Sequence, residues 1–289
     1  MSTLVVVQAG PNTLVQDLGR PGLAHLGMGS AGAMDRAALA LANRLVGNPS
    51  DAAGLEILFG NASFATDEDV WIAIAGAWGS VTAGGRAVQP HTTTMLAAGE
   101  TLLFGQAANG IRYYLAVRGG IETPVVLGSR SRDTLAGIGP DPLVDGQSIP
   151  IGPEPEAPIP PVDLVPVDAP TTGEVTLELR PGPRRDWFAE DAWHVLMAAD
   201  WRVSPRSDRS GIRVEGPALQ RRNTGELPSE GMLPGAIQVS PDGAPTILAV
   251  DHPVTGGYPV IAVVTDESLD ALAQLRPGQP LRFRLATGR

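Results

Sequence analysis

The chemistry that this sequence offers comes mainly from carboxylates and arginines placed among glycines. Asp17, Arg20 and Asp35 lie in such segments between residues 12 and 56. Arginine binds carboxylate and phosphate groups through two parallel hydrogen bonds, and a paired acid and base can activate water. We therefore interpret these three residues as catalytic candidates. Local ion pairs that brace Gly-rich turns are the alternative interpretation, and we expect Arg20 to be an exposed turn residue.

A second group of candidates lies in later turns and at predicted strand ends. Arg130 belongs to a Ser/Gly turn whose backbone N–H groups could hold an anion, although a solvated loop explains the same pattern. Asn43 lies off the apolar face of a helix predicted over residues 33–46, where it could point at the Gly-rich loop. We predict substrate-binding roles for the following polar residues: Asn43, Arg130, Asp208, Arg209, Arg213, Gln238 and Tyr258.

The four histidines are far apart in the sequence. None has the spacing of metal ligands, so we predict no metal site from them. His25, in the Gly-rich loop, and His252, which follows Asp251, are the two that general acid–base chemistry could use. The residues to which we assign catalytic roles are Asp17, Arg20, His25, Asp35 and Asp251.

Two absent residue types exclude several chemistries. The chain has no cysteine, which excludes disulfides, thiolate catalysis and Cys-ligated metals. All 21 basic residues are arginine, so the chain cannot form a Schiff base, carry biotin on a lysine or supply the lysine of a P-loop. The motifs of serine hydrolases and HExxH metalloproteases are also absent.

Composition favours a β-rich globular protein. The 289 residues include 35 glycines and 27 prolines, which indicate many turns, and 43% apolar residues. The net charge of −10 argues against nucleic acid or an anionic membrane surface as a partner. We see no basic N-terminal region and no long apolar segment, and therefore predict a cytoplasmic protein without a membrane span.

The chain is predicted to form two domains joined by a Pro-rich segment. Residues 151–173 are rich in proline and acids and poor in aromatic residues, so we expect an extended connector. The first domain then covers residues 1–150 and the second residues 174–289, each built from short strands bounded by glycines.

A short sequence pattern recurs in both predicted domains. It reads Leu-x-x-Gly-(Glu/Gln)-x-(Leu/Ile)-x-(Phe/Ile), and its copies begin at Leu96, Leu143 and Leu275. Each copy predicts a tight turn followed by a strand that alternates apolar and polar residues.

Several segments, in the same order along the chain, resemble one protein family. They include QDLGRPG from Gln16, SAGAMD from Ser30, ANRLVGN from Ala42, YYLAVRGGI from Tyr113 and TGGYPVIA from Thr255. These segments are similar to the allophanate-hydrolase-subunit-2 family. That family is also described as the A/B part of a biotin-dependent carboxyltransferase domain, as the C-type subunit of 5-oxoprolinase and as the Kip-type regulators. The resemblance spans nearly the whole chain.

The resemblance implies a mainly β chain with a few short helices, arranged as tandem cyclophilin-like β-barrel domains. It also implies a subunit of a heteromeric, ATP-dependent hydrolase acting on C–N bonds of a small carboxylate substrate. The reaction favoured is that of 5-oxoprolinase, in which 5-oxoproline, ATP and water yield glutamate, and allophanate hydrolase is the other label. The implied partners are an allophanate-hydrolase-subunit-1-type subunit and a LamB/YcsF-type protein. We expect the ATP site to be shared with a partner or to lie on one, and the chain to be inactive alone.

Two alternatives stay open from the sequence. A Kip-type regulatory protein would bind a kinase inhibitor and need no catalysis. A carboxyltransferase module would act on biotin carried by another chain, which the absence of lysine permits. The metal requirement of the assembly is equally open.

Overall fold

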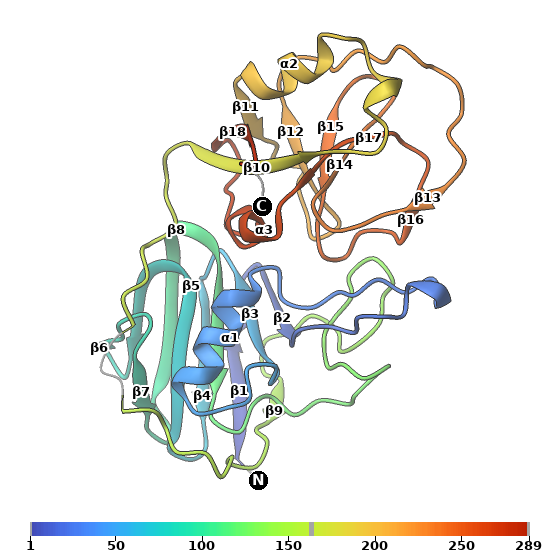
Figure 1. Ribbon diagram of the computed structural model, residues 1–289. Helices are drawn as coiled ribbons and strands as arrows, with labels where there is room; N and C mark the ends of the chain where they lie inside the picture. Colours follow the sequence, from blue (N-terminus) through green and yellow to red (C-terminus); the bar gives the residue numbers. More distant parts are fainter. Residues whose placement is uncertain (1, 162–164, 288–289) are drawn as a thin grey trace. The chain divides into compact units, whose positions relative to one another are not determined.

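The computed structural model describes residues 2–161 and 165–287, which form a mostly β structure with three short α-helices (Figure 1). The described residues divide into two compact units. The first unit draws on residues 2–20, 31–133, 137–161 and 165–170, and the second on residues 21–30, 134–136 and 171–287. In the described part of the chain, no helix has both the length and the apolar character needed to cross a membrane.

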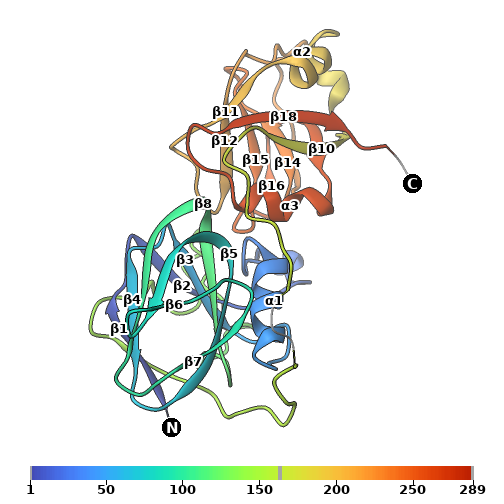
Figure 2. The same cartoon turned by 90° about the vertical axis from the view of Figure 1, so that its left-hand side faces the viewer.

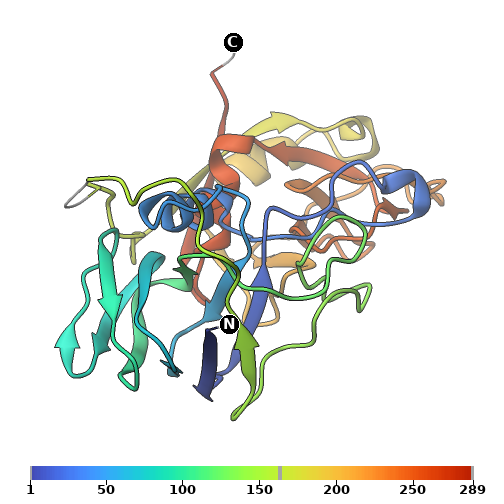
Figure 3. The ribbon, with the colours of Figure 1, turned by 90° about the horizontal axis from the view of Figure 1, so that it is seen from below.

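The first unit is a half-barrel. Among its described residues the sheet has nine strands in the order β2-β3-β8-β4-β1-β9, and β5 pairs with β6, β7 and β8. The strands are β1 (Thr3–Gln8), β2 (Asn12–Gln16), β3 (Gly54–Leu58), β4 (Ala62–Thr66), β5 (Val70–Ala83), β6 (Arg86–Ala87), β7 (Thr93–Leu96), β8 (Thr101–Val117) and β9 (Ser148–Pro150). β9 lies beside β1 near the N-terminus (Figure 3).

Two long antiparallel strands, β5 and β8, organise the first unit. Their apolar residues are buried on one side against the half-barrel core, which includes Ile72 and Leu115. On the other side Ala73 and Tyr114 pack against residues of helix α1. Figure 2 shows α1 beside this sheet. Burial on both faces explains why the run WIAIA has no apolar/polar alternation.

Helix α1 (Arg36–Leu45) begins and ends at clear signals. The side chain of Asp35 accepts a hydrogen bond of 2.9 Å from the backbone N–H of Ala38, which satisfies one of the free donors of the first turn. At the other end Gly47 has φ of 71°, a conformation that favours glycine after a helix. The helix expected over residues 33–46 is present with a later start, because Asp35 acts as its N-cap.

The second unit is a closed barrel of seven strands in the order β10-β17-β14-β15-β12-β11-β18, with β10 parallel to β18. These strands are β10 (Val175–Pro181), β11 (Trp201–Val203), β12 (Gly211–Glu215), β14 (Ala236–Val239), β15 (Pro245–Leu248), β17 (Val260–Val264) and β18 (Pro280–Leu285). The unit also contains a two-stranded sheet and two helices: β13 (Glu230–Gly231), β16 (Thr255–Gly256), α2 (Ala192–Ala198) and α3 (Asp266–Ala273). The prediction of a mainly β chain built from barrels is confirmed, with one barrel closed and one half-barrel.

The three copies of the short sequence pattern form the predicted turns. Gly99, Gly146 and Gly278 have φ values of 77°, 81° and 79°, which lie in the left-handed region that glycine enters without strain. Each glycine is followed within two residues by the start of a strand, namely β8, β9 and β18. The turns predicted from this pattern are therefore present in both units.

The described part of the Pro-rich segment is held along the first unit. The guanidinium of Arg118 donates to the carbonyl oxygens of Val46, Pro155 and Ala157 at 2.8–2.9 Å. The backbone N–H of Val165 donates to the carbonyl of His91. Arg118 thus fastens this segment to the end of helix α1.

Candidate functional site

Asp17 fastens the loop after β2 to the Ser/Gly turn. Its carboxylate accepts hydrogen bonds from Gly19 N (2.7 Å), Ser129 Oγ (2.6 Å), Arg130 N (2.6 Å) and Ser131 Oγ (2.5 Å). Four donors occupy most of the accepting capacity of a carboxylate. The contacts therefore favour a positioning role for Asp17, and the backbone of Arg130 takes part in that contact. The Arg130 side chain pairs with Glu122.

Arg20 is buried, with 2% of its surface exposed, so the expectation of an exposed turn residue is wrong. Its Nη2 donates to the carbonyl of Ser131 at 2.5 Å. Its Nε and Nη1 groups have no hydrogen-bond partner among the described residues, and no carboxylate in that part of the chain pairs with it. Burying a cation without a counter-ion is costly. Arg20 is therefore the strongest candidate in the first unit for holding an anionic group.

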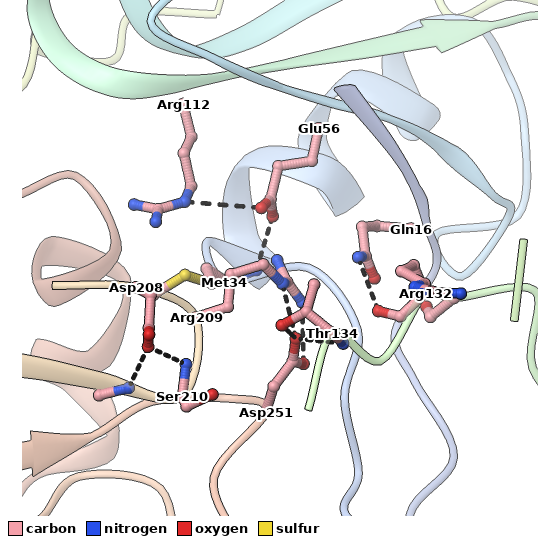
Figure 4. Close-up of polar contacts among 12 residues, drawn as sticks. Gln16, Met34, Glu56, Arg112, Arg132, Thr134, Asp208, Arg209, Ser210 and Asp251 are labelled. Carbon is pink, nitrogen blue, oxygen red and sulfur yellow. Dashed lines mark hydrogen bonds and ion pairs between the residues drawn. The ribbon is translucent and has the colours of Figure 1, made fainter. Parts of the chain in front are cut away.

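A buried acid, Glu56, forms a network that the assignment of site residues missed. Its Oε2 accepts from Tyr114 Oη at 2.7 Å. The same oxygen accepts from Met34 N (3.0 Å), and Oε1 lies 3.5 Å from Nε of Arg112 (Figure 4). The backbone N–H of Asp35 donates to Tyr114 Oη at 2.8 Å. The antiparallel register of β3 and β8 places Glu56 opposite Tyr114. The sequence signal that could have identified Glu56 was its single charge in the otherwise apolar strand GLEIL.

The environment of Tyr114 keeps its hydroxyl protonated. Burial is the main cause that raises the pKa of Tyr114 well above its usual value of 10.0, and the nearby charges of Glu56 and Asp35 add to it. The neutral hydroxyl can therefore donate to Glu56 while it accepts from the backbone. This links helix α1 to the half-barrel through one side chain.

Replacing Tyr114 by phenylalanine is expected to destabilise the chain by about 1–3 kcal/mol, because the N–H of Asp35 loses its partner in a buried position. The wild-type protein should also lose stability as the pH rises above about 10, since the unfolded tyrosine releases a proton that the folded one retains. Tyr114→Phe should lose less stability than the wild type above about pH 10. Urea unfolding between neutral and alkaline pH measures both effects. Tyr258→Phe, at an exposed hydroxyl, is the control; equal stability of Tyr114→Phe and wild type would contradict the expectation.

Asn43 braces the turn after helix α1. Its Nδ2 donates to the carbonyl of Ala52 at 2.7 Å, and its Oδ1 accepts from Asn48 at 3.1 Å. Asn48 in turn binds Val117 O and Gly119 N. Both asparagines are buried and their amides are engaged with the backbone at the end of β8. These contacts favour a structural role for Asn43.

In the second unit, Arg209 and Asp251 form a buried ion pair. Arg209 Nε lies 2.9 Å from Asp251 Oδ2, and Nη2 lies 3.1 Å from Oδ1 (Figure 4). Thr134 donates to the same Oδ2 from its backbone N–H (2.9 Å) and its hydroxyl (2.7 Å). Both charged side chains are at most 5% exposed. Asp251 thus accepts four hydrogen bonds and ties residues 134–136 to the barrel.

The remaining candidates divide between turns and a pocket. Asp208 accepts from the backbone N–H groups of Ser210 and Gly211, which fixes the turn before β12. His25 is exposed, in the short 3₁₀-helix Ala24–Leu26, and its Nδ1 lies 3.1 Å from the carbonyl of Gly22. Three of the predicted substrate-binding residues come together at one pocket of about 500 Å³, and these are Arg213, Gln238 and Tyr258.

The described residues do not offer a metal centre. Within residues 2–161 and 165–287, no group of three or more His, Cys, Asp or Glu side chains is placed to hold a metal ion.

The chain combines a half-barrel with a closed seven-stranded barrel. A family model described as the carboxyltransferase domain, subdomains A and B, matches residues 26–285. The chain belongs to this carboxyltransferase-domain family.

Three similar proteins are compared with this chain. The C-type subunit of the 5-oxoprolinase of Escherichia coli (strain K12) is 36% identical over 283 residues, which cover 97% of this chain and 90% of the relative. The crystal structure of TTHA0988 is 35% identical with a TM-score of 0.88, over 98% of this chain and 55% of that one. The K. lactis urea amidolyase structure is 28% identical with a TM-score of 0.92, over 99% of this chain and 19% of that one. This chain thus spans about half of TTHA0988 and a smaller part of the amidolyase. None of these three relatives bears on the regulatory alternative, which stays a prediction.

Proposed function

We propose that this chain is the C-type subunit of a heteromeric, ATP-dependent 5-oxoprolinase. The observation that carries the proposal is the match to the corresponding E. coli 5-oxoprolinase chain over nearly the full length of both proteins. The match to urea amidolyase, in contrast, covers 19% of that chain. In this proposal the buried Arg20 of the first unit is the residue that contacts the reacting substrate.

The ring opening makes clear demands on such a site. In the net reaction one water opens the ring: its oxygen bonds to the lactam carbonyl carbon, the C–N bond breaks, and the ring nitrogen takes up a proton. A second water is consumed as ATP becomes ADP and phosphate. Negative charge develops on the former carbonyl oxygen, which needs preorganised donors, and the substrate carries a carboxylate as well. In the proposal, the Nε and Nη1 groups of Arg20 supply such donors, in a position already removed from water.

We assign water activation to a partner subunit. Asp17 and Asp251 each already accept four hydrogen bonds from donors of this chain, and taking a proton from water would weaken those contacts. The catalytic assignments of His25 and Asp35 stay predictions. Glu56 is directed at Tyr114 and Met34, which favours a supporting role.

We likewise place the ATP phosphates mainly on a partner. The chain has no lysine and no P-loop motif, so the usual phosphate-binding loop is absent from its sequence. The partners that the resemblance implies are an allophanate-hydrolase-subunit-1-type subunit and a LamB/YcsF-type protein. Arg20 would then contribute one part of a shared site.

The purified chain alone is expected to form no glutamate from 5-oxoproline and ATP, because it lacks the water-activating group and the phosphate-binding loop. Adding both partner subunits should restore glutamate formation, and omitting any one of the three should abolish it. Coupled assays for glutamate and for phosphate, run on each combination, measure this. Sustained turnover by the chain alone would show that the complete site lies on this chain.

A carboxyltransferase role is the second candidate. It is favoured by the family model and by the urea amidolyase match. The biotin would have to be carried by another chain, because this one has no lysine to carry it. Avidin binds biotin and separates the two candidates: an avidin-sensitive reaction of the assembled system supports carboxyl transfer, and avidin-resistant glutamate formation supports the hydrolase.

A further inference from the structure

Three neighbouring strands of the closed barrel present a row of polar side chains. Arg213 of β12 pairs in register with Thr246 of β15, which pairs with Gln238 of β14. Side chains alternate between the two faces of a strand, and the adjoining row faces the barrel core. That adjoining row consists of the buried residues Ile212, Ile237 and Ile247. The polar row therefore lies on the outer face, where it lines the pocket of about 500 Å³.

The walls of this pocket are preorganised by side-chain hydrogen bonds. On one side Ser204 Oγ donates to Glu215 at 2.7 Å, and Ser207 Oγ accepts from the backbone N–H of Arg213 at 3.0 Å. On the other side the carboxylate of Asp242 accepts from Ser240 Oγ and from the backbone of the same turn. A pocket with fixed walls loses less entropy when a ligand binds. Its volume lies within the range of about 300–1,000 Å³ typical of small-molecule sites.

The pocket lining presents several hydrogen-bond donors. Its two acids, Glu215 and Asp242, each accept hydrogen bonds through one oxygen within the walls. The hydrogen bond from Ser240 is the main cause that lowers the pKa of Asp242, with Arg206 as a minor one. In the described part of the chain, the guanidinium of Arg213 has neither an ion pair nor a hydrogen bond. The Gln238 amide and the Tyr258 hydroxyl lie in the same lining. A guanidinium with these donors beside it matches an oxyanion.

We propose that this pocket binds a small organic molecule through an oxyanion group, carboxylate or phosphate, held by the guanidinium of Arg213. Gln238 and Thr246 supply further hydrogen bonds, and the ring of Tyr258, which is 43% exposed, covers the apolar part of the ligand. The site uses other residues than the lactam chemistry assigned to Arg20. Its binding is measured on the chain alone, so either proposal can fail without the other.

Titration calorimetry of the full chain tests the proposal, with 5-oxoproline, L-glutamate and inorganic phosphate as probes. We expect saturable binding of at least one probe, and the preferred probe distinguishes carboxylate from phosphate. Arg213→Ala should weaken that binding at least about tenfold, as loss of a charge-assisted contact does. Arg213→Lys keeps the charge but loses the fork and should weaken binding as well. Arg284→Ala removes an exposed arginine from strand β18 of the same barrel and should bind as the wild type does.

Two results would overturn the proposal. One is the absence of saturable binding for all three probes up to about 10 mM, which is about ten times a weak Kd of 1 mM. The other is binding that Arg213→Ala leaves unchanged or that Arg284→Ala weakens equally. Melting curves confirm that each variant is folded. If Arg213→Ala does not fold, Gln238→Ala tests the same pocket.

Discussion

Replacing Arg20 by alanine is expected to lower glutamate formation by the assembled enzyme by about 10²–10³-fold, the effect of removing one preorganised oxyanion donor. The reason is that its Nε and Nη1 groups are buried and have no partner among the described residues. The cost in stability should be smaller, about 1–3 kcal/mol, because the structure records one hydrogen bond of the side chain, to Ser131. Steady-state assays with both partners present, together with melting curves of the chain, measure the two effects.

Two further variants sharpen that experiment. Arg20→Lys retains the positive charge but not the planar fork, so it should recover part of the activity lost in Arg20→Ala. Arg86→Ala removes an exposed arginine of the first unit, paired with Glu100, and should leave activity and melting temperature close to those of the wild type. If the melting temperature of Arg20→Ala collapses together with its activity, Arg20 is a structural residue and its catalytic assignment fails.

Replacing Asp251 by alanine is expected to have the largest effect on stability, about 3–5 kcal/mol, because it leaves Arg209 as a buried cation without this partner. The substitution also removes the acceptor of both hydrogen bonds from Thr134. The melting temperature of the second unit should fall by about 10 °C or more. Calorimetric unfolding of the full chain measures this change.

The matched control is an exposed ion pair of the same barrel. Arg284→Ala breaks the pair with Glu178, whose side chain is 32% exposed, and should cost less than about 1 kcal/mol. Asp251→Asn keeps the shape of the side chain and one acceptor oxygen. Its loss of stability should therefore lie between those of Asp251→Ala and Arg284→Ala. If Asp251→Ala costs no more than Arg284→Ala, the buried pair contributes little to folding.

Much of the fold could be predicted from local sequence signals. The Leu-x-x-Gly pattern predicted three turns. Each turn has a residue with positive φ, which favours glycine whatever the tertiary surroundings are. The helix over residues 33–46 was predicted from its apolar face, a signal that lies within the helix itself. Closure of the second barrel could not be predicted from the residues, because β10 and β18, which pair in parallel, lie about 100 residues apart.

For the candidate site, the sequence by itself identified residue types, and the tertiary structure decided their partners. Their place among glycines marked Asp17 and Arg20 as catalytic candidates, with a local ion pair as the alternative interpretation. The structure instead gives Asp17 to the turn around Ser131 and leaves two donors of the buried Arg20 unfilled. Likewise, Arg213 and Gln238 were two separate predictions until the register of β12, β15 and β14 placed them in one row. Local backbone preferences depend on neighbouring residues, whereas burial and strand register depend on segments far apart in the chain, which the sequence order does not specify.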